Sequence, residues 1–308
     1  YPGTGNLDTD PLFVDAANGD FRLQACSPAI DAGTNTGAPA SDLDGNSRPF
    51  NTYGIGAATV DMGAYEHSTA VNYCTSCLGG NILYVKANAT GANNGSNWTN
   101  AFTDLQKALT VANACSAVTE IWVAAGTYKP TTGTDRTISF RMKNDLAIYG
   151  GFAGNETERS QRDFITHITT LSGDLNGDDV IFGSGSSLDI TNNGENSYHV
   201  VRNNFTGDNP LTSSAILDGF TIRGGCNQVS LIGPNNVGGG MQNSYASPTL
   251  SNLIFIGNRA EQGGGGMFNS LESSPVLTNV TFQQNLSMNQ GGGMYNYAGA
   301  NAVLENVA

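Results

Sequence analysis

The fold is indicated by a short motif that occurs three times near the C-terminus: Gly238-Gly-Gly-Met-Gln-Asn243, Gly264-Gly-Gly-Met-Phe-Asn269 and Gly291-Gly-Gly-Met-Tyr-Asn296. The methionines of successive copies are 26 and 27 residues apart, and a leucine recurs every 27 residues between them, at Leu250, Leu277 and Leu304. A fixed period of about 20–50 residues is typical of solenoids, propellers and repeat arrays. The C-terminal part therefore repeats one structural unit.

The residues between the motifs favour strands over helices. Leu250, Asn252 and Ile254 would lie on one face of an extended strand, and Leu253 and Phe255 on the other. Each repeat carries a glycine triplet, which excludes helical solenoids, and no hairpin turn pattern occurs. Short strands separated by Gly and Asn, without hairpins, predict an all-β fold in which each turn stacks on the last, a parallel β-helix.

Two sets of side chains are expected to recur along such a stack. The asparagines at equivalent positions should form hydrogen-bonded ladders: Asn243, Asn269 and Asn296, and separately Asn258 and Asn285. The recurring apolar residues should form the core: Leu250, Leu277, Leu304, Phe255 and Phe282. Both features are interpreted as scaffold and not as chemistry.

One helix is predicted, over residues 103–115. Leu105, Ala108, Leu109 and Ala112 fall on one face of it, and Thr103 is the expected N-cap. A short amphipathic helix before the first turn would cover the apolar end of the solenoid. Strand-like segments with looser spacing follow it at residues 120–125, 146–149, 169–172, 198–202 and 216–222.

Composition narrows the classes of partner. The 308 residues include 40 glycines, only 13% are charged, and 26 acidic against 13 basic residues give a net charge of −13. This acidic balance disfavours nucleic acid and anionic membranes, which both need a basic surface. A 39% apolar content argues against disorder. No apolar run approaches the ~20 residues of a membrane span.

The five cysteines are Cys26, Cys74, Cys77, Cys115 and Cys226. Cys74 and Cys77 form a CxxC pair, but no second half of a zinc site follows, and the flanks are unlike those of a redox motif. We expect one or two disulfides in an exported protein, with Cys115 paired to Cys74 or Cys77. The odd number leaves at least one thiol unpaired within the chain.

Two acidic loops are candidate calcium sites. They place oxygen ligands at alternate positions around a glycine: Asp42, Asp44 and Asn46 in the first loop, and Asp174, Asn176 and Asp178 in the second. Such spacing lets alternate side chains converge on a hard cation. The alternative is an Asx-turn without metal.

The sequence contains no recognisable catalytic constellation. Arg259, Glu261, Glu272 and Glu305 are the only charged residues in 238–308, and no nucleophile motif occurs. We therefore expect a non-enzymatic protein. The alternative is a carbohydrate-binding or polysaccharide-degrading, pectate-lyase-like protein, since Phe268 and Tyr295 recur beside the glycine–methionine motif, although Gln242 breaks the series.

Residues 82–163 resemble the opening of right-handed parallel β-helix domains from large bacterial surface and secreted proteins. The resemblance rests on Ile82-Leu-Tyr-Val-Lys, Thr90 to Trp98, Glu120 to Pro130 and Ile148-Tyr-Gly-Gly-Phe. The glycine-rich repeats are similar to those of polymorphic outer-membrane proteins, with Met where those often carry Ala-Ile. The resemblance implies a right-handed β-helix displayed on a bacterial cell surface, and it implies no reaction.

Residues 11–66 resemble a different family, the choice-of-anchor Q domain. The resemblance is carried by Ser27-Pro-Ala-Ile-Asp-Ala-Gly33, Asp42-Leu-Asp-Gly-Asn-Ser-Arg48 and Val60 to Glu66. It implies a small β-rich cap that closes the C-terminal end of a β-helix, with Asp42, Asp44 and Arg48 as a structural carboxylate–guanidinium group. The expected organisation is an anchor-like segment at 1–66, a linker at 67–80 and a β-helix at 81–308, subdivided into 81–130, 131–235 and 236–308.

The cap-like segment precedes the helix, which is the reverse of the usual order. The chain is therefore interpreted as a window of a tandem array or as a subunit that assembles head-to-tail, because the open last turn of a β-helix recruits partners. The expected contacts in such a polymer are Pro11, Leu12, Phe13, Val14, Leu304 and Val307. The function expected is that of an extracellular structural or adhesive protein whose partners are its own copies, adjacent units of a longer chain or surface glycans.

Overall fold

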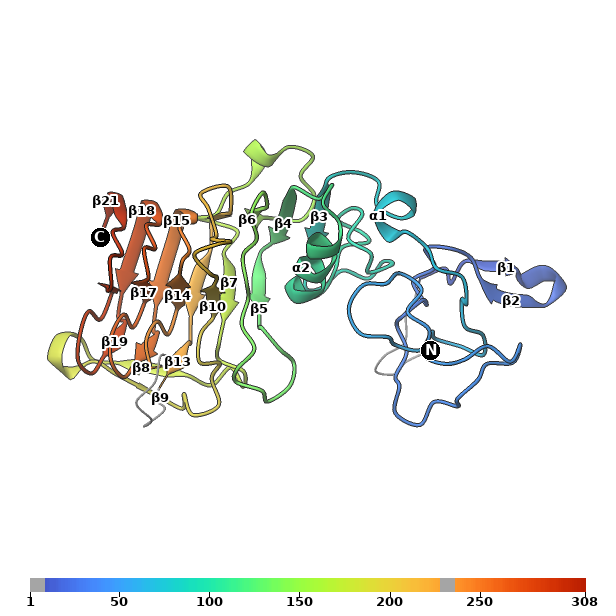
Figure 1. The fold of residues 1–308 in the computed structure, drawn as a ribbon, viewed down its shortest axis with the longest axis horizontal. Helices are drawn as coiled ribbons and strands as arrows, with labels where there is room; N and C mark the ends of the chain where they lie inside the picture. Colours follow the sequence, from blue (N-terminus) through green and yellow to red (C-terminus); the bar gives the residue numbers. More distant parts are fainter. Residues whose placement is uncertain (1–8, 228–235) are drawn as a thin grey trace. The chain divides into compact units, whose positions relative to one another are not determined.

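The computed structural model describes residues 9–227 and 236–308, which belong to two compact units divided between Thr119 and Glu120 (Figure 1). Most of the regular secondary structure is β-strand, and the larger sheets of the second unit are parallel. In the described ranges, no helix is long and apolar enough to cross a membrane. The end of the predicted irregular region, residues 228–235, lies outside the described residues.

The first unit, called unit 1, has little regular structure. Its elements are β1 (Phe13–Asp15), the 3-10 helix η1 (Ala16–Asn18), β2 (Asp20–Leu23), α1 (Tyr73–Ser76), β3 (Ile82–Val85) and α2 (Leu105–Ala114). β1 and β2 pair antiparallel. The predicted linker at 67–80 contains α1 and both cysteines of the CxxC pair, so the division of the chain by contacts falls later than the expected boundary at 81.

The predicted helix is present as α2, and its expected apolar face is buried. Leu105, Ala108, Leu109 and Ala112 are all at most 4% exposed, and the helix contacts β3. The predicted N-cap was wrong by one residue: Asp104 caps the helix, its carboxylate accepting a hydrogen bond from Gln106 N at 2.8 Å. The Asp104 carboxylate reaches a backbone amide in the first turn that has no partner within the helix, which is what an N-cap requires.

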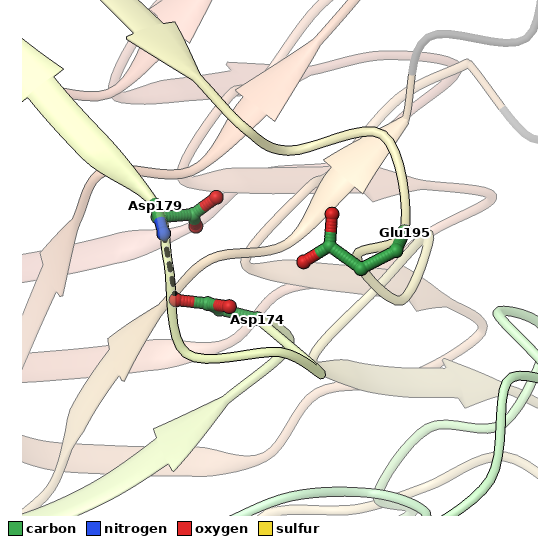
Figure 2. Close-up of side chains that lie close together, drawn as sticks. All are labelled: Asp174, Asp179 and Glu195. Atoms are coloured by element: carbon green, nitrogen blue, oxygen red, sulfur yellow. Dashed lines mark hydrogen bonds between the residues drawn. The ribbon is translucent and has the colours of Figure 1, made fainter.

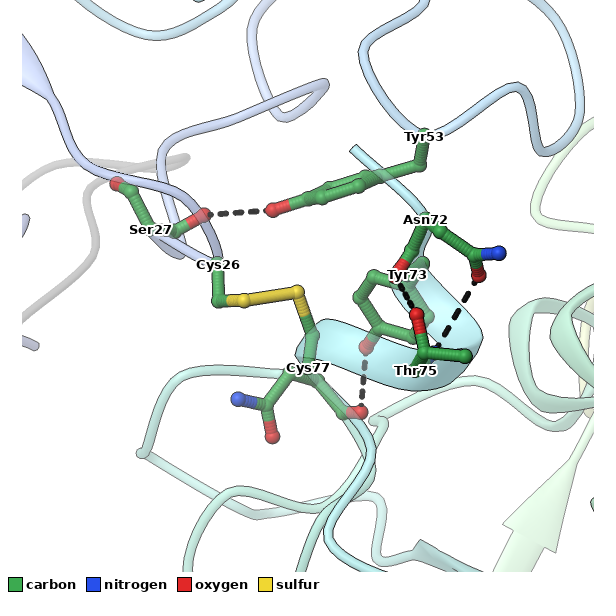
Figure 3. Close-up of a disulfide and its surroundings, with 8 residues drawn as sticks. Cys26, Ser27, Tyr53, Asn72, Tyr73, Thr75 and Cys77 are labelled. Atoms are coloured by element: carbon green, nitrogen blue, oxygen red, sulfur yellow. Dashed lines mark hydrogen bonds between the residues drawn. A yellow bond between two sulfur atoms is a disulfide. The ribbon is translucent and has the colours of Figure 1, made fainter. Parts of the chain in front are cut away.

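Covalent and side-chain contacts hold unit 1 together. Cys26 is bonded to Cys77 at the end of α1, as Figure 3 shows, and Tyr53 donates a hydrogen bond to the carbonyl of Ser27 beside this disulfide. A small core of Leu23, Ala29 and Ile30 lies nearby, with Phe13, Tyr53 and Met62 packed against it. Because so few strands are present, these contacts replace a backbone ladder.

In the second unit, called unit 2, the regular structure of the described residues consists of short strands and two 3-10 helices joined by loops. Its strands are β4 (Glu120–Ala124), β5 (Gly126–Tyr128), β6 (Ala147–Phe152), β7 (Thr169–Ser172), β8 (Val180–Phe182), β9 (Asp189–Thr191), β10 (Val201–Asn204), β11 (Ile216–Asp218), β12 (Thr221–Arg223), β13 (Cys226–Asn227), β14 (Met241–Ser244), β15 (Thr249–Ile256), β16 (Arg259–Ala260), β17 (Met267–Ser270), β18 (Val276–Gln283), β19 (Leu286–Ser287), β20 (Met294–Asn296) and β21 (Val303–Val307), with 3-10 helices η2 (Arg159–Gln161) and η3 (Gly185–Ser187).

Successive strands of the repeat region belong to three different parallel sheets (Figure 1). One sheet has the order β10-β14-β17-β20 and another β13-β16-β19. In the largest sheet, β11, β15, β18 and β21 follow one another. The 27-residue period is the register of this pairing, since Leu250 pairs with Leu277 and Leu277 with Leu304. β8 and β9 are the exception, an antiparallel pair that lies between β7 and β10 in the sequence.

The predicted alternation along β15 was wrong. Asn252 adopts a left-handed conformation with φ of 52°, which bends the strand in its middle. Leu250, Leu253 and Phe255 are consequently all buried, at 0%, 1% and 0% exposure, while Ile254 faces outward. Asn279 repeats this bend one turn later with φ of 56°. Asparagine tolerates this conformation better than other non-glycine residues, so the sequence repeats it where the chain must turn.

The predicted asparagine ladders are confirmed. Asn243 Nδ2 donates to Asn269 Oδ1 at 2.8 Å, and Asn269 Nδ2 donates to Asn296 Oδ1 at 2.8 Å. Asn203 extends this ladder by one turn, donating to Asn243 at 2.9 Å. Asn258 and Asn285 form the second ladder at 2.9 Å. Within each ladder the amide of one asparagine satisfies that of the next, so the ladders help to hold neighbouring strands in register.

The glycine triplets are required by close packing between turns. Gly264 has φ of 64°, and a Cβ at Gly266 would lie 2.6 Å from the carbonyl oxygen of Gly293 on the next turn. No side chain fits there. Beside this contact, the rings of Phe255 and Phe282 stack with centroids 4.9 Å apart.

The core prediction fails at the last turn. Leu250, Leu277 and Phe255 are fully buried, but Leu304 is 50% exposed and Phe282 is only half-buried. In the described residues β21 pairs with β18 on one side only. Leu277 is therefore buried where its strand is paired on both sides, and Leu304 is exposed on a strand that the described residues pair on one side.

Candidate metal centre

The second acidic loop follows β7 and turns back on itself around Asp174. Asp174 is buried, with only 3% of its surface exposed. Its carboxylate accepts hydrogen bonds from the backbone amides of Gly177, of Asp178 at 3.1 Å and of Asp179 at 3.2 Å. The carboxylate thus shapes the loop, as in the Asx-turn that the sequence offered as the alternative.

Three carboxylates converge at this loop. Asp174, Asp179 and Glu195 each present an oxygen, and these oxygens all lie within 4.8 Å of one another. In Figure 2 the Glu195 carboxylate approaches the other two from a separate segment of chain, beyond the β8–β9 pair. Such an arrangement places three negative charges close together, which is unfavourable unless a proton or a cation is shared among them.

Electrostatics single out Asp179. The pKa of Asp179 is raised to about 7, mainly by burial and also by the charges of Asp174 and Glu195, while the hydrogen bond from Asn196 and the charge of Arg223 lower it. Asp179 Oδ2 accepts a hydrogen bond from Asn196 Nδ2 at 2.9 Å. Its Oδ1 and Glu195 Oε1 are buried and have no hydrogen-bond partner. A proton or a cation at this point would satisfy both oxygens.

The group can hold a metal ion. Carboxylate oxygens are ligands for hard cations. Asn196 and Ser197, which follow Glu195, are fully buried. Asn196 Oδ1 and Ser197 Oγ also have no hydrogen-bond partner. Lys129 supplies a positive charge at the loop, donating from Nζ to the carbonyl of Leu175 at 2.9 Å.

Sequence reasoning located the loop but not the ligand set. Asp174 belongs to the cluster, whereas the predicted Asn176 and Asp178 do not. Asp179 is the next acidic residue in the sequence and could have been included on that ground. Glu195 is separated from it by the β8–β9 pair, and no spacing rule connects the two, so only the fold brings them together.

The first acidic loop is different. Asp42 Oδ1 accepts hydrogen bonds from Asp44 N at 2.9 Å and Asn46 N at 2.7 Å, and its Oδ2 accepts from Asn46 Nδ2 at 3.0 Å and Glu66 N at 2.9 Å. Burial alone would raise the pKa of Asp42, but these hydrogen bonds lower it below its usual range. The carboxylate is saturated by protein donors, which favours the Asx-turn interpretation.

The anchor-like resemblance implied that Asp42, Asp44 and Arg48 form a carboxylate–guanidinium group, but in the structure Arg48 pairs with Glu66. Arg48 Nε lies 2.8 Å from Glu66 Oε2, and both side chains are buried. Arg48 Nη2 also donates to the carbonyl of Asp61 at 2.7 Å. Asp44 pairs instead with Arg22 at 2.7 Å near the surface. The hydrogen bonds to the Asp42 carboxylate come from Asp44, Asn46 and Glu66.

The cysteines form two disulfides, Cys26–Cys77 and Cys74–Cys115. The expected pairing of Cys115 with Cys74 or Cys77 is confirmed, and the pairing excludes zinc and redox interpretations of the CxxC pair. Cys226 is the remaining thiol, and burial raises its pKa to about 12. A thiol with a raised pKa is unreactive. The two bonds indicate an oxidising environment.

The predicted polymer contacts are exposed to different degrees. Val14 and Leu304 are 50% exposed, whereas Pro11, Leu12, Phe13 and Val307 are half-buried. Phe13 packs edge-to-face against Phe21 within its own unit, with ring centroids 5.3 Å apart. Leu304 on β21 is therefore more exposed than Phe13.

No family model, curated protein or solved structure matches this chain.

Proposed function

We propose that this chain is a non-enzymatic, extracellular structural protein of a bacterial surface, and that unit 2 is a right-handed parallel β-helix acting as a stiff shaft. The observation that carries the proposal is the in-register stack of β14, β17 and β20 with its continuous asparagine ladder. In such a stack, backbone and side-chain hydrogen bonds run between turns, and an aliphatic column fills the interior. Bending the shaft would break several of these contacts at once.

The disulfides support an extracellular location. Cys26–Cys77 and Cys74–Cys115 tie α1 to two other parts of unit 1. Such bonds persist in secreted and surface proteins and are rare in the cytosol.

We further propose that the open edge of β21 pairs with a second copy of this chain, giving head-to-tail assembly. Val303 and Leu304 are 54% and 50% exposed on that strand. An unpaired apolar edge is a template for strand addition, and a contact of this kind that does not close produces a filament. An anchor-like segment around Pro11–Val14 is the proposed complement, by its resemblance to domains that close β-helices.

Calcium is the cation proposed for the Asp174–Asp179–Glu195 cluster. Its ligands are oxygens only, and calcium accepts irregular oxygen coordination where magnesium demands a near-ideal octahedron. Bound there, the ion would join the loop after β7 to the segment after β9 and so stiffen an irregular part of the shaft.

Negative-stain electron microscopy of the whole chain, over a range of concentrations, tests the assembly. We expect short rods at low concentration and filaments with a regular axial repeat at high concentration. Leu304→Lys should leave only single rods, because a charge at the edge opposes strand addition. Ile254→Lys is the matched control, since Ile254 is 40% exposed on β15, which is paired on both sides.

Two results would count against the proposal. Single rods of the parent chain at every concentration would rule out self-assembly while leaving the shaft. Particles without an elongated body would rule out the β-helix itself.

A further inference from the structure

A groove runs along the face of unit 2 formed by β10, β14, β17 and β20. Its volume is about 790 Å³, and all of its lining residues belong to this unit. The interior face of the same sheet holds Met241, Met267 and the asparagine ladder, so the groove lies on the opposite, outward face. None of its lining residues belongs to the cluster of Asp174, Asp179 and Glu195.

The floor of the groove is one register column. Arg202 pairs with Gln242, Gln242 with Phe268 and Phe268 with Tyr295. Three steps of ~4.8 Å between strands make this column ~14 Å long. Although they point outward, Gln242 is only 4% exposed and Phe268 only 7%. Their burial shows that the walls rise above the floor, as in a binding groove and unlike an open sheet face.

The walls add polar and aromatic groups. One side carries Leu271 and Tyr297, and the other carries amide side chains, including Asn289 and Gln290. The three rings form a continuous series: Phe268 and Tyr295 have centroids 5.7 Å apart, and Tyr295 and Tyr297 6.2 Å apart. The lining therefore combines flat apolar faces with neutral hydrogen-bonding groups.

We propose that this groove binds a linear, neutral oligosaccharide. Sugar rings present apolar C–H faces, which pack on aromatic rings, and a rim of hydroxyls, which amides and serine hydroxyls can both donate to and accept from. Ser244 and Ser270 lie in the lining beside the aromatic residues. The length of the column suits several linked sugars better than a single one.

The same observations disfavour other occupants. Arg202 is the only charged residue of the lining, its guanidinium donates to Gln242 Oε1 at 3.0 Å, and the chain carries a net charge of −13, so a polyanion is repelled. A peptide that adds as a strand needs a free edge. β14 and β17 on the floor are paired on both sides, so they offer none.

A glycan array of immobilised neutral oligosaccharides, probed with the whole chain, tests the proposal. We expect binding to at least one neutral class and a loss of at least tenfold in Tyr295→Ala and in Tyr297→Ala. Tyr297 is 58% exposed, so its replacement leaves the fold intact. Phe182→Ala is the matched control, because Phe182 is a 49% exposed aromatic residue outside the groove lining and should bind within twofold of the parent.

Three outcomes would overturn the inference. One is no binding of the parent chain to any neutral glycan, and another is binding that both tyrosine variants retain. The third is binding restricted to sulfated or uronic-acid glycans, or to an unfolded peptide spotted on the same array. Thermal melting of each variant by circular dichroism separates a lost ligand contact from a lost fold. Rod formation is scored independently, so this inference and the proposed shaft can fail separately.

Discussion

Residues 9–66 and residues 237–308 are stabilised in opposite ways. The first segment has two short strands and depends on single contacts between residues far apart in sequence, such as Arg48 with Glu66 and Asp42 with the amide of Glu66. The second repeats the same contacts on every turn, as in the ladder through Asn243 and Asn269. Stabilising contacts are therefore spread over the repeats in residues 237–308, whereas in residues 9–66 they are concentrated in a few buried groups.

The two arrangements respond differently to damage. In the stack, a core position is protected only where turns lie on both sides of it, so equivalent residues differ in importance. In residues 9–66, by contrast, the buried Arg48–Glu66 pair and the hydrogen bond from the amide of Glu66 to Asp42 are each formed once and are not repeated along the chain. Four changes test this contrast, and their expected free-energy effects decrease in the order given.

The largest effect is expected from Leu277→Asp. Leu277 is fully buried between β15 and β21, so the change removes core packing and buries a charge, at a cost of at least ~4 kcal/mol. Leu304→Asp, at the same position of the last turn, should cost less than ~1 kcal/mol because Leu304 is half exposed. Urea unfolding of both variants measures the difference. Equal losses would contradict the exposure of β21.

A loss of roughly 3–5 kcal/mol is expected for Arg48→Met, because the change leaves the buried Glu66 carboxylate without its guanidinium. The double variant Arg48→Met/Glu66→Gln should recover much of this loss. Arg22→Met is the control, since Arg22 pairs with Asp44 at the surface, and its effect should be hard to measure. Thermal unfolding of the three variants tests this, and a mild Arg48→Met would show that residues 9–66 do not depend on this pair.

Acid should weaken the stack through His199. Its Nδ1 lies 2.8 Å from the carbonyl of Gly238, and burial lowers the pKa of His199 from 6.5 to about 4. The unfolded chain takes up the proton first as pH falls, so stability present above about pH 6.5 is lost towards pH 4. The loss is about 3 kcal/mol at 1.36 kcal/mol per pKa unit.

Urea unfolding at pH 7 and pH 4.5 measures this loss, with His199→Gln as the reference that lacks the titrating group. The parent should lose more stability than the variant between the two pH values. His167→Gln, at a half-buried position, serves as a control that keeps His199. Parallel pH dependence of the parent and His199→Gln would exclude His199 as the cause.

The smallest effect is expected from calcium at the acidic cluster. At a free calcium concentration ten times the dissociation constant, binding should stabilise the chain by ~1.4 kcal/mol. Stabilisation should be greater at pH 8 than at pH 5.5, because the raised pKa of Asp179, about 7, leaves it protonated at the lower pH.

The variants Asp179→Asn and Asp208→Asn, melted with calcium and with a chelator, test this site. Asp179→Asn should lose the calcium effect and, in chelator at pH 8, melt higher than the parent, because one buried negative charge is removed. Asp208→Asn changes an exposed aspartate and should behave like the parent. A calcium effect that survives in Asp179→Asn would place the ion elsewhere.

Much of the repeat region could be predicted from sequence because its contacts are periodic. The spacing of Leu250 and Leu277 equals the register of the strands, and equivalent asparagines in the sequence are neighbours in the ladder. The apolar face of α2 was predictable for the same reason, since residues three and four apart share a helix face. Local rules failed where one residue changed the backbone, as the left-handed Asn252 did in β15.

The candidate sites required the tertiary structure. Glu195 reaches Asp179 only because the chain returns past the β8–β9 pair, and Glu66 rather than Asp44 meets Arg48 because the loop is folded around Asp42. The amino-acid sequence determined the period, the repeated strands and the register of their parallel pairing, since these depend on neighbours at constant spacing. Only the tertiary structure decided which carboxylates lie close together and which side chains line the groove. These contacts join residues whose separation in the sequence follows no regular interval.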